Sequence, residues 1–184
     1  MKRIFLITLM TLVGLAAMAQ NVTTFLGIPV DGTKAEMRSK LIAKGYQTVA
    51  GEEFLTGEFN GQDVVIYIYT NNNKVWRVAV ANVNDVDEAQ IKIHFNTLVR
   101  QFESNKRYVS YNGDQTIGED VDISYEMSVH SKQFQANFYQ VSDSDSFETA
   151  SPKQVWFSIF EKYGRYRIGI YYENLYNQAN GEDL

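Results

Sequence analysis

Two stretches of the chain alternate large apolar and polar residues on either side of a polar turn, a pattern typical of β-hairpins. The first reads VVIYIYTNNNKVWRVAVANV over residues 64–83, and the second reads VWFSIFEKYGRYRIGIYYEN over residues 155–174. Because successive side chains of a strand point to opposite faces, each hairpin divides into two rows. The mainly aliphatic row is predicted to be core and consists of Ile66, Ile68, Val78 and Val80 in the first hairpin, with Val155, Phe157, Ile159, Ile168 and Ile170 in the second.

The other row combines aromatic and arginine side chains and is the candidate binding surface. Its members, here called the aromatic face, are Tyr67, Tyr69, Arg77, Trp156, Phe160, Arg165, Arg167 and Tyr171. Tyr, Trp and Arg are enriched in protein–protein interfaces, and the same rings can stack on sugars. Aromatic residues also stabilise sheets by cross-strand packing without binding anything. We expect these side chains to line one open sheet face that binds a protein, with a glycan or another small ligand as the alternative.

The sequence DGTKAEMRSKLIAKGY carries the signals of a short helix. Thr33 is a good N-cap residue and Glu36 follows three positions later, which predicts a capping box. Met37 and Leu41 lie four residues apart and would face the core. Gly45 is placed to end the helix in the left-handed conformation.

A longer helix is predicted to begin near the sequence NDVDEAQ, where Asp85 and Glu88 could form a second capping box. Its apolar stripe recurs at helical spacing and consists of Ile91, Phe95, Leu98 and Phe102. We expect this helix to end within residues 104–106.

The remaining apolar runs have strand character. They cover residues 54–59, 64–69, 75–82, 107–111, 123–130, 134–140, 155–160 and 166–172. The dipeptide Asn60-Gly61 is a strong signal for a two-residue hairpin turn. Residues 141–152 are rich in Ser, Asp and Thr, and we expect them to form an exposed loop.

The order of these elements predicts an α+β fold made of two related units. Each unit would be a helix followed by an antiparallel β-meander, with repeat 1 at about residues 25–83 and repeat 2 at about residues 84–176. The helices would pack on one sheet face of a single domain formed by residues 20–184. The alternative is that any two amphipathic hairpins resemble each other without being copies.

The segment GTKAEMRSKLIAKGY is similar to the opening of small α/β repeat modules in the outer-membrane assembly lipoprotein family and the β-lactamase-inhibitor-like proteins. The resemblance depends on five residues: Gly32, Thr33, Met37, Leu41 and Gly45. It consists of a glycine, a capping threonine and a short apolar helix that closes on glycine before antiparallel strands. The resemblance implies a non-catalytic secreted or envelope module that binds protein.

The first residues, MKRIFLITLMTLVGLAAMAQ, have the pattern of a secretory signal peptide. Lys2 and Arg3 precede an apolar run at residues 4–15, and a small-x-small motif ends at Ala19. A retained anchor is the alternative, but the run is shorter than the roughly 20 residues of a membrane span. We therefore expect cleavage after Ala19, no stable membrane anchor, and a periplasmic or secreted protein.

Composition narrows the possible functions further. The whole chain carries a net charge of −5, and loss of Lys2 and Arg3 makes the remainder more acidic, which disfavours nucleic acid as a partner. The chain has no Cys, which excludes disulfides and a lipid anchor through cysteine. No phosphate-binding glycine motif occurs, so no cofactor is predicted.

Catalytic and metal-binding patterns are sparse. The only histidines, His94 and His130, stand in no zinc-binding spacing, and no G-x-S-x-G motif is present. A hydrolase is therefore the third alternative, and it would need one of these histidines beside a carboxylate and a nucleophile. Asp143, Asp145 and Glu148 could offer oxygens to calcium, but they lack the EF-hand pattern, so no metal site is predicted.

Overall fold

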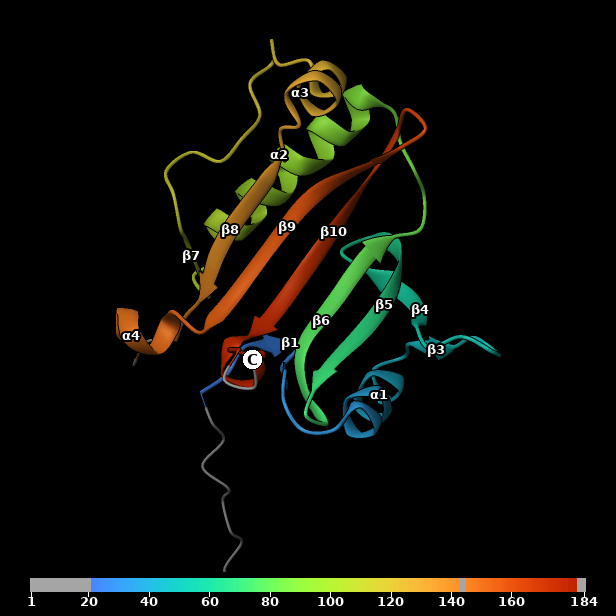
Figure 1. The fold of residues 1–184 in the computed structure, drawn as a ribbon, viewed down its shortest axis with the longest axis vertical. Coiled ribbons are helices and arrows are strands. Elements are labelled where there is room, and N and C mark those ends of the chain that lie inside the picture. Colours follow the sequence, from blue (N-terminus) through green and yellow to red (C-terminus); the bar gives the residue numbers. More distant parts are fainter. Residues whose placement is uncertain (1–20, 143–144, 182–184) are drawn as a thin grey trace, which may run out of the picture.

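The computed structural model describes residues 21–142 and 145–181, so the predicted signal peptide lies outside the described residues. Its main feature is an eight-stranded antiparallel sheet with the order β3-β4-β5-β6-β10-β9-β8-β7 (Figure 1). The strands are β3 Gln47–Thr48, β4 Leu55–Phe59, β5 Gln62–Asn71, β6 Lys74–Asn82, β7 Tyr108–Ser110, β8 Gln135–Gln140, β9 Lys153–Lys162 and β10 Arg165–Asn174. A two-stranded sheet, β1 Thr24–Phe25 and β2 Ile28–Pro29, lies outside it. The α+β class and the antiparallel sheet are therefore confirmed.

The helices are α1 Lys34–Ala43, α2 Glu88–Ser104, α3 Ile123–His130 and α4 Phe147–Ala150, followed by the 3-10 turn η1 Leu175–Asn177. Helix α1 contacts β5 and β6, whereas α2 contacts β7 and β10. Both cover the same sheet face, because their buried side chains join one core cluster with the mainly aliphatic row of the strands. Figure 1 shows α2 passing behind β8 and β9, so the view looks onto the opposite face.

The centre of the sheet explains why the mainly aliphatic row is core. Four buried residues lie opposite one another across β5, β6, β10 and β9, namely Ile66, Val80, Ile170 and Phe157. Both α1 and α2 are followed in the chain by four strands of the sheet, and the last strands of these two runs, β6 and β10, pair at its centre.

Local signals in the first half of the chain are realised. The Thr33 hydroxyl accepts from the amide of Glu36 at 3.2 Å, and the Glu36 carboxylate accepts from the amide of Thr33 at 2.8 Å. Gly45 has a φ of 101° directly after the helix. Asn60 and Gly61 both have positive φ in the β4–β5 turn, as a two-residue hairpin turn requires. The capping box, the glycine stop and this turn are confirmed.

The predicted strand at residues 123–130 is wrong, because this segment is the helix α3. Its sequence ISYEMSVH alternates in polarity, yet only Ile123 is buried and Val129 is 57% exposed. The apolar side chains of an extended segment would therefore gain no burial against a second layer. The Asp122 carboxylate instead caps a helix by accepting from the amide of Tyr125 at 2.7 Å. His130 therefore ends a helix rather than a strand.

The start of α2 also differs from the prediction. Its N-cap is Asp87, whose carboxylate accepts from the amide of Gln90 at 2.8 Å, rather than Asp85. Glu88 does not close a capping box, because its carboxylate accepts from the amide of Ile123 at 2.7 Å. The predicted end of this helix within residues 104–106 agrees with its last residue, Ser104.

The segment 141–152 is not simply an exposed loop. It contains α4, and the side chain of Asp145 is only 2% exposed. That carboxylate pairs with the Lys153 ammonium at 2.5 Å, which ties the segment to the first residue of β9. The expectation of general exposure is therefore wrong at Asp145.

Candidate functional site

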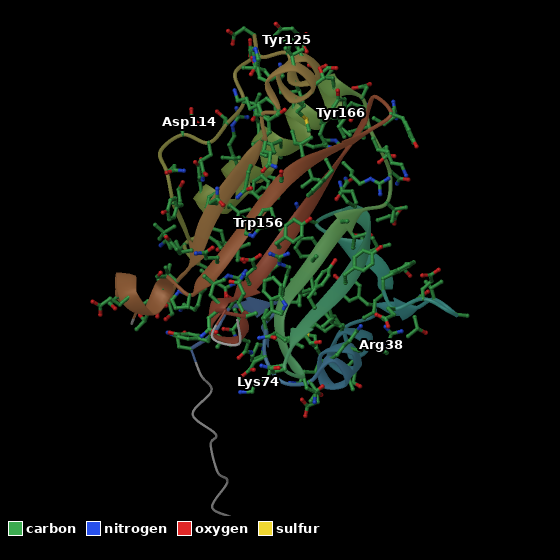
Figure 2. The ribbon with its side chains drawn as sticks, in the orientation of Figure 1. Arg38, Lys74, Asp114, Tyr125, Trp156 and Tyr166 are labelled. Atoms are coloured by element: carbon green, nitrogen blue, oxygen red, sulfur yellow. The ribbon has the colours of Figure 1, made fainter. Side chains whose placement is uncertain are left out.

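The eight residues of the aromatic face all point away from α1 and α2. Strand register places Tyr67, Tyr171 and Trp156 in one row across β5, β10 and β9, with Ala79 of β6 between the first two. Each residue of this row stands between two buried core residues of its own strand. Figure 2 shows Trp156 near the middle of the sheet on the side that faces the viewer.

The rings of this face contact one another. Trp156 and Tyr171 are stacked with centroids 4.0 Å apart, and Phe160 meets Tyr171 edge-on at 6.3 Å. On the other side of β6, Tyr67 and Tyr69 lie 6.5 Å apart. Tyr67, Tyr69 and Phe160 remain 38%, 44% and 43% exposed, so the face presents apolar surface as well as internal packing.

Arg77 occupies the middle of these rings. Its guanidinium carbon lies 4.2 Å from the ring centre of Trp76, 5.3 Å from Tyr171 and 5.7 Å from Trp156. It also pairs with the buried carboxylate of Glu173 at 2.5 Å. The arrangement combines an ion pair with cation–π contacts, so the positive charge is matched within the chain itself.

Trp76 and Glu173 belong to this site but were not predicted. A register shift between Tyr69 and Thr70 breaks simple alternation in the β5–β6 hairpin, and Trp76 lies opposite this irregularity. Glu173 could have been found, because it alternates with Tyr171 on β10 and stands opposite Arg77. The sequence signal for Glu173 was an acidic residue near the end of the largely aromatic strand β10.

Arg165 and Arg167 form hydrogen bonds to the loop that leads into α2. Arg167 holds the carboxylate of Asp85 through two hydrogen bonds of 2.6 and 3.0 Å, and Arg165 donates to the Asp85 carbonyl at 2.8 Å. The hydrogen bond from Arg167 lowers the pKa of Asp85 and raises that of Arg167 itself. These two arginines thus fix the edge of the aromatic face to the β6–α2 connection.

Two hollows adjoin Trp156 on this side of the sheet. One, of about 250 Å³, is lined by Tyr111, Asn112, Asn137, Phe138, Tyr139, Gln154, Val155 and Trp156. The other, of about 530 Å³, is lined by Ser124, Met127, Ser128, Gln133, Gln135, Trp156, Ser158, Ile159, Phe160 and Glu161. Trp156 is common to both, whereas Tyr67, Tyr69, Arg77 and Tyr171 line neither.

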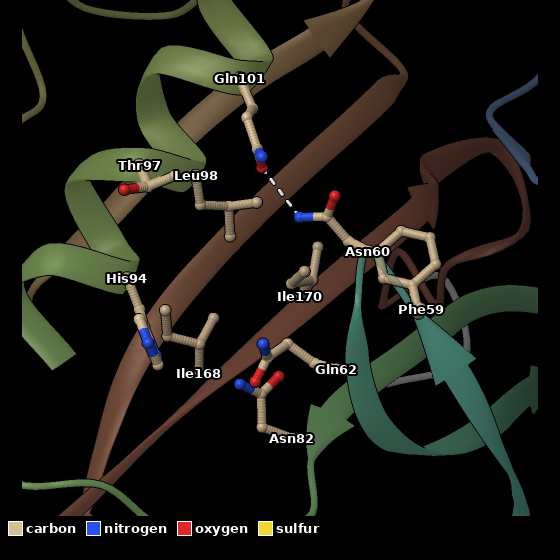
Figure 3. A pocket seen from close by; sticks show the side chains of 10 residues that line it. All are labelled: Phe59, Asn60, Gln62, Asn82, His94, Thr97, Leu98, Gln101, Ile168 and Ile170. Carbon is tan, nitrogen blue, oxygen red and sulfur yellow. Dashed lines mark hydrogen bonds between the residues drawn. The ribbon is translucent and has the colours of Figure 1, made fainter. Parts of the chain in front are cut away.

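A separate cleft, the helix-side cleft, lies on the opposite face between the β4–β5 hairpin and α2. Figure 3 shows its narrower part, of about 140 Å³, lined by Phe59, Asn60, Gln62, Asn82, His94, Thr97, Leu98, Gln101, Ile168 and Ile170. A second hollow of about 490 Å³ continues past Asn60 and Gln101 toward Arg107 and Tyr172. Sequence patterns did not indicate this cleft, because its walls come from segments far apart in the chain.

The histidines do not form a recognisable catalytic group. His130 lies 3.2 Å from the carboxylate of Glu126 on the exposed side of α3. His94 lines the narrow part of the helix-side cleft beside Thr97, and no carboxylate is among the residues that line this part. Within residues 21–142 and 145–181, no group of three or more potential ligands could hold a metal ion. Of the calcium candidates, Asp145 is paired with Lys153 and Asp143 lies outside the described residues.

Comparisons of the chain with protein-family models, curated proteins and solved structures found no match. The resemblance carried by residues 32–45 therefore stays an expectation. None of the helices in the described part of the chain is long and apolar enough to span a membrane. The fold and the two surfaces are thus the basis for a functional proposal.

Proposed function

We propose that this chain is an exported, non-catalytic binding protein of the cell envelope whose aromatic face docks a protein partner. The observation that carries the proposal is the cluster of Trp156, Tyr171 and Arg77 at the centre of a sheet face that α1 and α2 leave open. Export rests on the predicted signal peptide, and binding rests on this cluster of side chains.

The charge pattern indicates what kind of partner the face accepts. Arg77 is matched by Glu173 and Arg167 by Asp85, so both cations are neutralised within the chain. A centre without uncompensated positive charge does not attract nucleic acid, in keeping with the acidic composition. The exposed rings of Tyr67 and Tyr69 instead suit a protein segment that presents aliphatic or aromatic side chains.

The test compares variants that remove the rings with one that removes an exposed apolar side chain elsewhere. Residues 20–184 would be used to capture partners from the envelope of the source cells, as wild type, as Trp156→Ala combined with Tyr67→Ala, and as Ile93→Ala. Ile93 is 63% exposed on α2 and serves as the control. A partner that Ile93→Ala retains would then be purified and its affinity measured by calorimetry.

We expect the double variant to bind the purified partner at least tenfold more weakly, since loss of one interface anchor typically costs about 2 kcal/mol or more. Circular dichroism would show that the double variant keeps its fold. Equal affinity of the folded double variant and the wild type for every purified partner would refute the proposed function.

We also propose that the two helix-and-four-strand runs are copies of one unit. The proposal is supported by the equivalent positions of the β5–β6 and β9–β10 hairpins, and by the pairing of their inner strands, β6 and β10, at the centre. The aromatic face would then be built from equivalent hairpins of both copies. Superposition of residues 34–82 on residues 88–174 in a crystal structure would test this, and a poor fit of the four strands would contradict it.

A further inference from the structure

The helix-side cleft has a chemical character different from that of the aromatic face. Its floor is apolar and is formed by Ile168 and Ile170 of β10, with Phe59 at the side (Figure 3). Four carboxamide side chains surround this floor: Asn60, Gln62, Asn82 and Gln101. No charged residue lines the narrow part of the cleft.

Several of these polar groups have unused hydrogen-bonding capacity. Within the described residues, the side chains of Asn82, His94 and Thr97 make no hydrogen bond to another residue, although all three line the narrow part of the cleft. Asn82 is half-buried at the end of β6, directly opposite the buried Val64. A carboxamide offers two donors and an acceptor, and partly buried groups of this kind are normally paired with protein, water or ligand.

One hydrogen bond crosses the cleft. The Asn60 amide donates to the Gln101 side-chain oxygen at 2.8 Å, which joins the tip of the β4–β5 hairpin to α2. Both residues also line the larger hollow, so this bond divides the two parts of the cleft. Both side chains are exposed, and a hydrogen bond in such a position contributes only about 1 kcal/mol, so a ligand that spans the two hollows can replace it.

We propose that the helix-side cleft binds a neutral saccharide. The hydroxyl groups of a sugar are both donors and acceptors, as are the carboxamides of Asn60, Gln62 and Asn82. The apolar face of a sugar ring fits the apolar floor and the ring of Phe59. A lipid chain would leave the half-buried Asn82 carboxamide unpaired, and the narrow part offers no cation to an anionic ligand. The larger hollow is lined by one carboxylate and one cation, Glu58 and Arg107. This site lies opposite the aromatic face and does not depend on the proposed function.

The volumes of the two parts of the helix-side cleft indicate the size of the ligand. The larger hollow of about 490 Å³ is in the usual range for small-molecule sites, roughly 300–1,000 Å³, whereas the narrow part of about 140 Å³ is below it. The ligand is therefore a short oligosaccharide that occupies both parts and crosses the position of the Asn60–Gln101 bond.

The experiment uses residues 20–184 and five neutral tetrasaccharides: maltotetraose, cellotetraose, xylotetraose, mannotetraose and chitotetraose. Binding would be followed by nuclear magnetic resonance, with each sugar at up to about 10 mM, which detects affinities in the millimolar range. We expect at least one sugar to shift the side-chain amide signals of Asn82 and Gln101. Asn82→Ala and Gln101→Ala should each weaken its binding about three- to tenfold, the effect of one hydrogen bond.

Trp156→Ala is the matched control, because it removes the ring best placed to stack on a sugar at the aromatic face while leaving the cleft intact. We expect this variant to bind the same sugar with unchanged affinity. Gln101 is exposed, so its replacement by alanine keeps the test valid even if Asn82→Ala does not fold. Absence of binding by all five sugars, or binding lost in Trp156→Ala and retained in Gln101→Ala, would overturn the proposal.

Discussion

The buried ion pair between Lys153 and Asp145 provides a sharp test of how the structure is held together. The two side chains are 3% and 2% exposed, and the ammonium lies 2.5 Å from the carboxylate. Asn21, near the start of the described chain, hydrogen-bonds to both partners. Lys153→Met would leave the Asp145 carboxylate buried without its cation. Removal of one partner from such a pair costs about 3–5 kcal/mol, a large part of the roughly 5–15 kcal/mol by which domains are stable.

The pKa of Asp145 determines how this contribution depends on pH. Burial raises the pKa of this carboxyl, but hydrogen bonds from Lys153, Ser142 and Asn21 outweigh burial and hold it well below its ordinary value of 3.8. A carboxyl whose pKa is depressed in the folded state stabilises the fold above its unfolded-state pKa. This stabilisation is lost as the pH falls below about 4, because the unfolded chain then binds a proton that the folded chain does not.

Urea denaturation of wild type, Lys153→Met, Asp145→Asn and the double variant Lys153→Met with Asp145→Leu would measure these effects. At pH 7 we expect each single variant to lose about 3–5 kcal/mol, and the double variant to lose much less because no buried charge remains. At pH 3 the difference between wild type and Asp145→Asn should be smaller than at pH 7. A loss below about 1 kcal/mol for Lys153→Met would show that the pair is solvated, and the reasoning would be wrong.

Three further substitutions test the core, a turn and a helix cap, each by the urea midpoint and circular dichroism. Phe157→Ala should destabilise the fold by about 3–5 kcal/mol, because the side chain is fully buried against Phe95 and Phe102; a loss under about 1 kcal/mol would place it outside the core. Gly61→Ala should cost about 1 kcal/mol, because φ is 73° in the β4–β5 turn; increased stability would contradict this turn geometry. Thr33→Ala should also cost about 1 kcal/mol, with Thr33→Ser as a near-neutral control; equal losses for both would show that the hydroxyl does not cap.

The features that sequence reasoning predicted are those decided by neighbouring residues. The capping box of Thr33 and Glu36 spans three positions, and the turn at Asn60 and Gly61 depends on two backbone angles. Strand alternation also predicted which rows of the two hairpins are buried, because one face of the sheet packs against helices. Such signals are local or strictly periodic, so they can be read without knowing the fold.

The errors occurred where a tertiary contact decided the outcome. Residues 123–130 alternate in polarity, but the bond from the Ile123 amide to the distant Glu88 favours a helix. The cap at Asp122 is a local signal, and the alternation was given more weight than this cap. Asp85 looked like a helix cap, yet the guanidinium of Arg167, far along the chain, binds it instead. The helix-side cleft was missed for the same reason, since Asn60 and Gln101 meet only after the chain has folded.

The packing of the aromatic face bears on whether it is a surface for binding or only a stable sheet. A Cβ atom at Gly169 would lie 2.9 Å from the Phe160 ring and 3.1 Å from the Tyr171 hydroxyl, so both side chains lean over this glycine. The stack of Trp156 on Tyr171 and the pairing of Arg77 with Glu173 hold the central side chains in place. Side chains already held in one conformation lose little entropy on binding, which favours affinity.

Cross-strand packing accounts for the stacked centre of the aromatic face, whereas three of its rings remain about two-fifths exposed. Tyr67, Tyr69 and Phe160 keep 38%, 44% and 43% of their surface in contact with solvent, although they stand beside the fixed central cluster. An ordered centre with exposed rings beside it suits the proposed interface, in which a partner would complete the burial of these rings. Loss of binding in the ring variants, with the fold intact, is therefore the result that separates recognition from sheet stability.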